Sequence, residues 1–234
     1  MIQNLKSLLR GPRSLELRAM RHDALGIFEA ALKSVDSRNA VKRHLKREKG
    51  LLSVGEIELD LSRIDSVRII AFGKASLPMA EAVAEIVELD EALVVTDRRA
   101  PPEGSGFRIV AAGHPHPDEG SLKAGSIALQ TARKCGRRDL LLVLVSGGGS
   151  AMLEDADLPL AALREVSDLL IRSGMDIKKL NTVRKHLSNI KGGQLGKVAA
   201  AGGGAVVALA VSDVVGDPPS FIASGPTVSD ETTF

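Results

Sequence analysis

The chain has 234 residues, enough for one large domain or for one domain with an extension. Lys and Arg total 31 and Asp and Glu total 29, so the net charge is only +2, while 44% of the residues are hydrophobic. This balance excludes a disordered or collagen-like chain, and the lack of Trp and Tyr argues against nucleic-acid modules that stack bases on aromatic side chains.

The sequence shows neither a convincing membrane span nor a secretory signal. Residues 198–212, the longest uncharged stretch, are few and interrupted by Gly and Ser, and residues 1–23 carry charges where a signal peptide needs an apolar core. Cys135, the single cysteine, excludes an intramolecular disulfide and a cysteine-based zinc site, and it fits a reducing compartment. We therefore expect a soluble, cytoplasmic protein with no nucleic-acid or membrane partner.

Residues 1–50 are expected to form a basic helical lead. This part of the sequence holds 12 Lys and Arg against 5 Asp and Glu. Within residues 14–35, apolar side chains recur at steps of three and four, which predicts a helix with an apolar stripe that faces the core. We interpret the basic run at residues 42–49 as a solvated helix end rather than a nucleic-acid or membrane patch, because charge runs are not specific.

After residue 50, short apolar runs alternate with segments of helix length. The runs LLLVLV and AVVALAV are continuously apolar, which is typical of strands buried on both faces. Alternating strands and helices predict an α/β fold class with a mostly parallel sheet flanked by helices. The expected strands are residues 67–71, 93–96, 108–111, 140–145 and 205–211, and the expected helices are residues 119–135, 159–173 and 182–201.

Ligands of such sheets bind at the carboxyl ends of the strands, so the segments that follow the strands are informative. The segment after residues 140–145 is a glycine-rich loop that matches neither a Walker A sequence nor GxGxxG. Its backbone N–H groups can converge on an anion, and we expect phosphate or carboxylate binding rather than a plain tight turn. The loop consists of Ser146, Gly147, Gly148, Gly149 and Ser150.

Charged side chains follow two other strands. Lys74 comes after residues 67–71, where it suits phosphate contact or transition-state stabilisation, and equally an ordinary surface position. Asp213 and Asp217 come after residues 205–211 and could together hold Mg²⁺. One of the two carboxylates could instead act as a general base, and the bland alternative for both is an Asp-Pro turn.

Residues 180–193 are predicted to form an amphipathic helix with one basic flank. At 100° per residue, its core stripe is Leu180, Val183, Leu187 and Ile190. The flank beside this stripe is Asn181, Arg184, Ser188 and Lys191. Residues 181–193 contain no acid, so we favour an anionic ligand over a solvated surface.

Two histidines alternate with prolines just before the helix expected at residues 119–135. His114 and His116 have no third histidine nearby, and a catalytic zinc needs three protein ligands, so we do not expect zinc there. Asp118 is better explained as the N-cap residue of the following helix.

These segments together resemble the N-terminal domain of the glycerate 2-kinase family, whose members carry a C-terminal MOFRL domain. The resemblance covers nearly the whole chain, in order, through FGKAS, AGHPHPDEGS, LVSGGGSAM, LNTVRKHLSNIKGG and SDVVGDPPSFIASGPT together with the leading helix. It implies a Rossmann-like α/β domain. It also implies phosphorylation of D-glycerate to 2-phosphoglycerate with ATP and Mg²⁺ as cofactors.

The resemblance also implies roles for individual residues. Lys74 would be the main catalytic cation and Asp213 a base or metal-associated carboxylate, with Mg²⁺ expected on Asp213 and Asp217. The residues expected to bind substrate or phosphate are Ser146, Gly147, Gly148, Gly149, Ser150, Asn181, Arg184, Lys191 and His114.

The chain ends at Phe234, where family members continue into the MOFRL domain. We therefore expect residues 1–234 to form the N-terminal α/β domain of a kinase, with the basic helical lead 1–50 as part of it. The MOFRL domain is expected to be absent, and a separate chain could supply it. A homodimer is also left open. Two alternatives are an NAD(P)H-dependent hydroxypyruvate reductase, for which the sequence lacks a dinucleotide fingerprint, and a non-catalytic anion-binding module.

Overall fold

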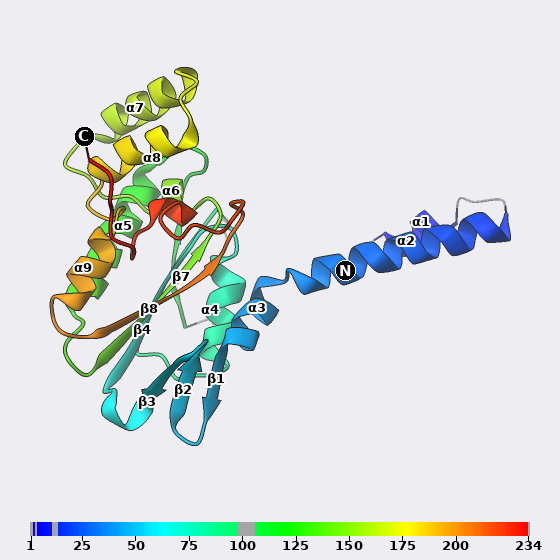
Figure 1. Cartoon of the computed structure of the whole chain (residues 1–234), viewed down its shortest axis with the longest axis horizontal. Coiled ribbons are helices and arrows are strands. Elements are labelled where there is room, and N and C mark those ends of the chain that lie inside the picture. The colour runs from blue at the N-terminus through cyan, green and yellow to red at the C-terminus, as the bar shows by residue number, and fades with distance from the viewer. Residues whose placement is uncertain (1, 3, 11–13, 98–105, 234) are drawn as a thin grey trace.

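The computed structural model describes residues 2, 4–10, 14–97 and 106–233. Their centre is a five-stranded sheet in the order β6-β5-β4-β7-β8, in which every neighbouring pair is parallel (Figure 1). This arrangement confirms the predicted α/β fold with a parallel sheet. The strands are β4 Ser66–Phe72, β5 Glu91–Thr96, β6 Arg108–Ala111, β7 Asp139–Ser146 and β8 Ala205–Val211.

Strand β7 lies between β4 and β8, and its packing shows why its apolar run is uninterrupted. Successive side chains of a strand point to opposite faces, and here both faces are covered by helices. One face packs against α3 Ser37–His44 and α4 Ser76–Ala84, and the other against α5 Glu119–Arg133 and α9 Gln194–Ala200. The β7 residues on the first face are Leu140, Leu142 and Leu144, and those on the second are Leu141, Val143 and Val145.

Helix α5 begins at the residue that the sequence indicated. The Asp118 side chain accepts a hydrogen bond from the Ser121 N–H at 2.9 Å, and the Ser121 hydroxyl accepts one from the Asp118 N–H at 3.1 Å. This reciprocal capping box satisfies N–H groups that the first helical turn leaves unpaired. The N-cap role predicted for Asp118 is thereby confirmed.

Beyond the carboxyl ends of the strands lie α6 Gly149–Met152, α7 Leu160–Arg172 and α8 Ile177–His186 (Figure 1). The helix predicted over residues 182–201 is divided here: α8 ends at His186 and α9 begins at Gln194. Gly192 and Gly193 adopt left-handed φ angles of 58° and 83°, which let the chain turn directly before α9, where Gly193 is the N-cap residue. Residues 187–193 therefore form a turn and not the helix flank that we expected.

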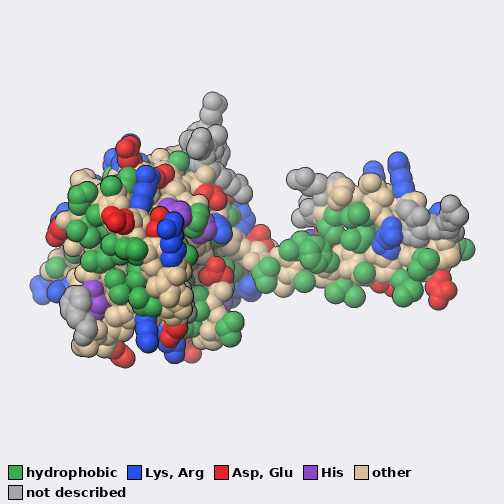
Figure 2. All heavy atoms as spheres, turned by 90° about the horizontal axis from the view of Figure 1, so that it is seen from above, with side chains coloured by type: hydrophobic (Ala, Val, Ile, Leu, Met, Phe, Trp, Pro, Cys, Tyr) green, Lys and Arg blue, Asp and Glu red, His purple; other side chains and the backbone are tan. Residues whose placement is uncertain are grey.

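The N-terminal helices α1 Leu5–Leu9 and α2 Leu15–Ser34 form an arm that points away from the sheet (Figure 1). The helix was predicted correctly, but its core-facing stripe was not, because α2 has no buried residue. Leu17, Met20 and Ile27 are 56%, 61% and 72% exposed. Figure 2 shows hydrophobic side chains along this arm, which lies apart from the helices that cover the sheet.

A second sheet was missed by the sequence analysis. It is a three-stranded antiparallel sheet of β1 Leu45–Glu48, β2 Leu51–Val54 and β3 Ile57–Asp60, followed by a short 3₁₀ helix, η1 Leu61–Arg63. The solvated helix end predicted at residues 42–49 is thus wrong after His44, and so is a helical lead that reaches residue 50. Lys49 and Gly50, at φ 48° and 84°, form the tight turn that joins β1 to β2.

Among the described residues, none of the helices combines the length and the hydropathy that a membrane span requires.

Candidate functional site

The loops after β4 and β7 are joined by hydrogen bonds. The Lys74 N–H donates to the Gly147 carbonyl oxygen at 3.0 Å, and the Ala75 N–H donates to Ser146 Oγ at 3.1 Å. These contacts arise because β4 and β7 are neighbouring parallel strands, whose carboxyl ends lie at the same edge of the sheet. Lys74 and the glycine loop, which follow two different strands in the sequence, therefore lie side by side.

Asp213 and His114 lie against the same loop. A Cβ added to Gly147 would be 2.3 Å from Asp213 Oδ2, and one added to Gly148 would be 3.0 Å from His114 Cδ2. Only glycine allows this approach at Gly147, and at Gly148 the φ of 85° also favours glycine. Asp213 comes from the segment after β8 and His114 from the segment after β6, so four loops contribute to the site.

The electrostatics of His114 show which charges surround it. Partial burial and then the Lys74 ammonium lower the pKa of the imidazole, while Asp97 and Asp213 act in the opposite direction. Asp97 directly follows β5 and was missed by the sequence analysis, although the same reasoning about strand ends would have found it. Lys74, Asp97 and Asp213 are solvent-exposed, so a ligand can reach them.

The basic flank predicted on residues 181–193 is rearranged. Lys191 is buried, with a side chain only 1% exposed, and forms an ion pair with the Glu154 carboxylate. Ser188 Oγ also donates to Glu154, at 2.6 Å. Because its charge is already paired inside the protein, Lys191 is not available to an external anion, which corrects the role expected for it.

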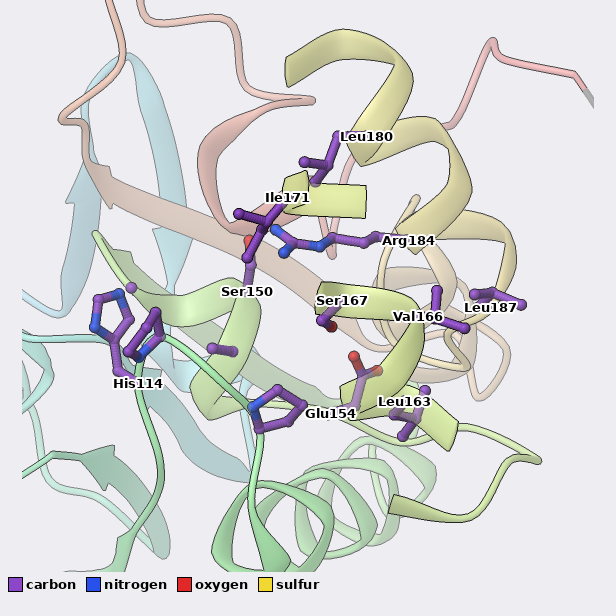
Figure 3. A pocket seen from close by; sticks show the side chains of 14 residues that line it. His114, Ser150, Glu154, Leu163, Val166, Ser167, Ile171, Leu180, Arg184 and Leu187 are labelled. Atoms are coloured by element: carbon purple, nitrogen blue, oxygen red, sulfur yellow. The ribbon is translucent and has the colours of Figure 1, made fainter. Parts of the chain in front are cut away.

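Arg184 and Ser150 line a cavity of about 370 Å³ that opens beside the loop (Figure 3). Burial lowers the pKa of the Arg184 guanidinium, opposed by the charge of Glu154, yet an arginine side chain stays protonated in proteins. Ser150 is hydrogen bonded to Ser224 Oγ at 3.0 Å. Asn181 is buried on α8 and is not among the described residues that line this cavity, so its role in binding stays a prediction.

The two predicted magnesium ligands lie in different surroundings. Asp213 lies against Gly147, whereas Asp217 lines another depression beside Ser212 and Pro219. Within the described ranges no group of three His, Cys, Asp or Glu side chains is arranged to hold a metal. Mg²⁺ needs only one or two carboxylates in addition to phosphate oxygens and water, so its assignment to Asp213 and Asp217 stays a prediction.

His116 lies apart from His114. Its Nδ1 is 3.6 Å from Asp168 Oδ1 on α7, and it faces that carboxylate while His114 lies at the glycine loop. The two histidines therefore have separate surroundings.

Comparisons with known proteins agree with the fold. Residues 23–234 match the family model described as "Domain of unknown function (DUF4147)". A glycerate 2-kinase from Pyrococcus horikoshii is 37% identical over 92% of this chain and 48% of its own length, and an Agrobacterium vitis protein provisionally named a hydroxypyruvate reductase is 40% identical over 89% and 45%. A crystal structure of a glycerate kinase from Thermotoga maritima gives a TM-score of 0.75 at 34% identity, covering 90% of this chain and 48% of that one. The chain spans about half the length of the curated relatives it matches.

Proposed function

This chain belongs to the DUF4147 family, and from that premise we propose that it provides the N-terminal half of an ATP-dependent D-glycerate 2-kinase. The observation that carries the proposal is the meeting of Lys74, Asp213 and the glycine loop at one edge of the sheet. Transfer of a phosphoryl group depends mainly on positioning and on neutralising negative charge. The exposed Lys74 ammonium can neutralise phosphate charge. The Asp213 carboxylate and the glycine loop, whose backbone a ligand can approach closely, can position the reacting groups.

The proposed reaction moves the γ-phosphoryl group of ATP to the 2-hydroxyl oxygen of D-glycerate. A bond forms between that oxygen and the γ-phosphorus, and the bond from the γ-phosphorus to the bridging oxygen of ADP breaks. Asp213 accepts the proton of the hydroxyl group, and Lys74 stabilises the charge on the transferred phosphoryl oxygens. The loop N–H groups and His114 hold the anionic groups of the ligands in place.

Magnesium fits the donor groups of this site. Asp213 lies against the glycine loop, and Asp97, which directly follows β5, acts electrostatically on His114 beside that loop. They are the oxygen ligands that Mg²⁺ prefers, and the bound ion would neutralise phosphate charge. Asp217 would join them only through a rearrangement of the segment after β8, because it now lines a separate hollow.

Relatives of about twice the length support the idea that further catalytic groups come from outside these 234 residues. We therefore propose that the chain works together with a polypeptide equivalent to the second half of the Pyrococcus horikoshii kinase. A reductase is less well supported, because the loop after β7 reads SGGGS and not GxGxxG.

The proposal is tested by measuring ADP release with ATP, Mg²⁺ and D-glycerate, using the chain alone and mixed with the second half of that kinase. Lys74→Ala should lower kcat by a factor of about 1,000 or more, since it removes a charge directed at the transition state. Lys123→Ala, on the exposed face of α5, is the matched control. Oxidation of NADH with hydroxypyruvate, in the absence of ADP release, would replace the kinase with a reductase.

A further inference from the structure

The cavity beside the glycine loop extends well past the groups assigned to D-glycerate. It shares His114, Gly148 and Ser150 with the site and then continues between α7 and α8 (Figure 3). Its far wall is aliphatic, formed by Leu163, Val166, Ile171, Leu180 and Leu187. The cavity is therefore polar at the loop. Between the helices its wall is mostly hydrocarbon, together with the Ser167 hydroxyl and the Glu154 carboxylate, which is paired with Lys191.

The size of the cavity indicates which ligand of the reaction it fits. Its volume of about 370 Å³ is within the range of about 300–1,000 Å³ found for pockets that enclose drug-sized molecules. D-Glycerate has only three carbons and no apolar face, so it would leave the aliphatic wall against water. A purine base with its ribose belongs to the larger size class and offers flat apolar faces to such a wall.

Arg184 provides a second, independent indication. Its side chain extends from α8 into the cavity towards Ser150 (Figure 3), and it is half-buried. None of the described residues forms a hydrogen bond with the guanidinium. Glu154 is the acid whose charge acts on Arg184, but its carboxylate already accepts hydrogen bonds from Lys191 and Ser188. A partly buried guanidinium without a bonded partner favours an anion, and its planar fork suits phosphate.

We propose that the cavity between α7 and α8 binds the nucleoside part of the phosphoryl donor, with Arg184 and Ser150 on its phosphates. The terminal phosphate then points past Gly148 to Lys74, and D-glycerate occupies the outer site beside Asp213. The inference rests on the proposed function for the identity of the donor, but nucleotide binding can be measured without turnover.

The test is isothermal titration calorimetry of the whole chain with ADP, adenosine and D-glycerate. Val166→Trp fills the cavity and should lower the affinity for ADP and for adenosine by about tenfold or more. The affinity for D-glycerate should stay within twofold of the original value. Leu169→Trp is the matched control, because Leu169 is on the same helix, 61% exposed and outside the cavity lining. Thermal melting of both variants checks that they fold.

Arg184→Gln separates the phosphate contact from the base contact. It should lower the affinity for ADP by about 10- to 100-fold, as expected for a lost charge-assisted hydrogen bond, and leave the affinity for adenosine within twofold of the original value. Arg172→Gln, at the exposed end of α7, is its control and should change neither ligand. This second variant keeps the test intact if Val166→Trp does not fold.

The outcomes distinguish the inference from the proposed function. ADP binding that is lost in Val166→Trp supports the inference even if no D-glycerate is phosphorylated. If Val166→Trp and Arg184→Gln both kept kinase activity and normal ADP affinity, the proposed function would stand and the assignment of the cavity to the nucleoside would be overturned. Failure of the unmodified chain to bind ADP at millimolar concentration, or a loss of D-glycerate binding alone in Val166→Trp, would also overturn it.

Discussion

The parallel sheet and helix α2 both carry clear apolar patterns, but only the sheet buries its pattern among the described residues. Leu140–Val145 of β7 are at most 3% exposed between two layers of helices, whereas Leu17, Met20 and Ile27 of α2 are more than half exposed. Strand β7 is covered on both faces by helices of the body, while α2 leaves the body beside α3 (Figure 1). An apolar stripe thus shows that a face is apolar without showing what covers it.

The largest loss of stability is expected at the buried ion pair between Lys191 and Glu154. Lys191→Met leaves the Glu154 carboxylate buried without its cation, which should cost about 3–5 kcal/mol of the free energy of unfolding. Urea denaturation measures the loss. Combining Lys191→Met with Glu154→Leu removes both charges and should recover much of the stability. A single variant as stable as the original would show that Lys191 is not held in this pair, and the ligand-binding role first expected for it would return.

A slightly smaller effect is expected for a cavity in the apolar core. Leu142→Ala on β7 removes a fully buried side chain and should cost about 2–5 kcal/mol of the free energy of unfolding. The same denaturation experiment measures it. If Leu142→Ala lost less than 1 kcal/mol, the two-sided packing of the sheet described above would be contradicted.

The smallest effect is expected from the same substitution on the arm. Leu17→Ala should change the free energy of unfolding by no more than about 0.5 kcal/mol, because Leu17 is exposed and alanine favours a helix. The difference between the stability losses of Leu17→Ala and Leu142→Ala measures how differently the two regions bury their apolar side chains. A loss equal to that of Leu142→Ala, and dependent on protein concentration, would mean that another copy of the chain covers the α2 stripe in solution.

Much of the sheet and half of the site were predictable from sequence for one physical reason. Strands buried on both faces have continuous apolar runs, and the loops after neighbouring parallel strands must meet at one edge. Lys74, Gly147 and Asp213 were therefore expected together and lie together. Asp97 follows the same rule and was missed because only three strand ends were considered.

Other features depend on partners distant in the sequence. Lys191 is held by Glu154, which lies 37 residues earlier and gives no local sign of the pairing. The antiparallel sheet was missed because β1 contains a run of charges with a single buried residue, Leu45, which gives little period-two alternation. The arm illustrates the reverse case, in which a clear period of 3.6 indicated the helix but not its surroundings.

The most direct test of the site is an NMR titration of His114, assigned with His114→Gln. We predict a pKa below the ordinary value of 6.5, because burial and Lys74 disfavour the imidazolium. Lys74→Ala should raise this pKa, and D-glycerate or inorganic phosphate should also raise it in the unmodified chain, since a bound anion stabilises the charged ring. His22 on α2 is the internal control, because a ligand at the site should leave its signal where it was. A His114 pKa that responds neither to Lys74→Ala nor to either anion would contradict the gathering of Lys74, His114 and Asp213 into one anion-binding site.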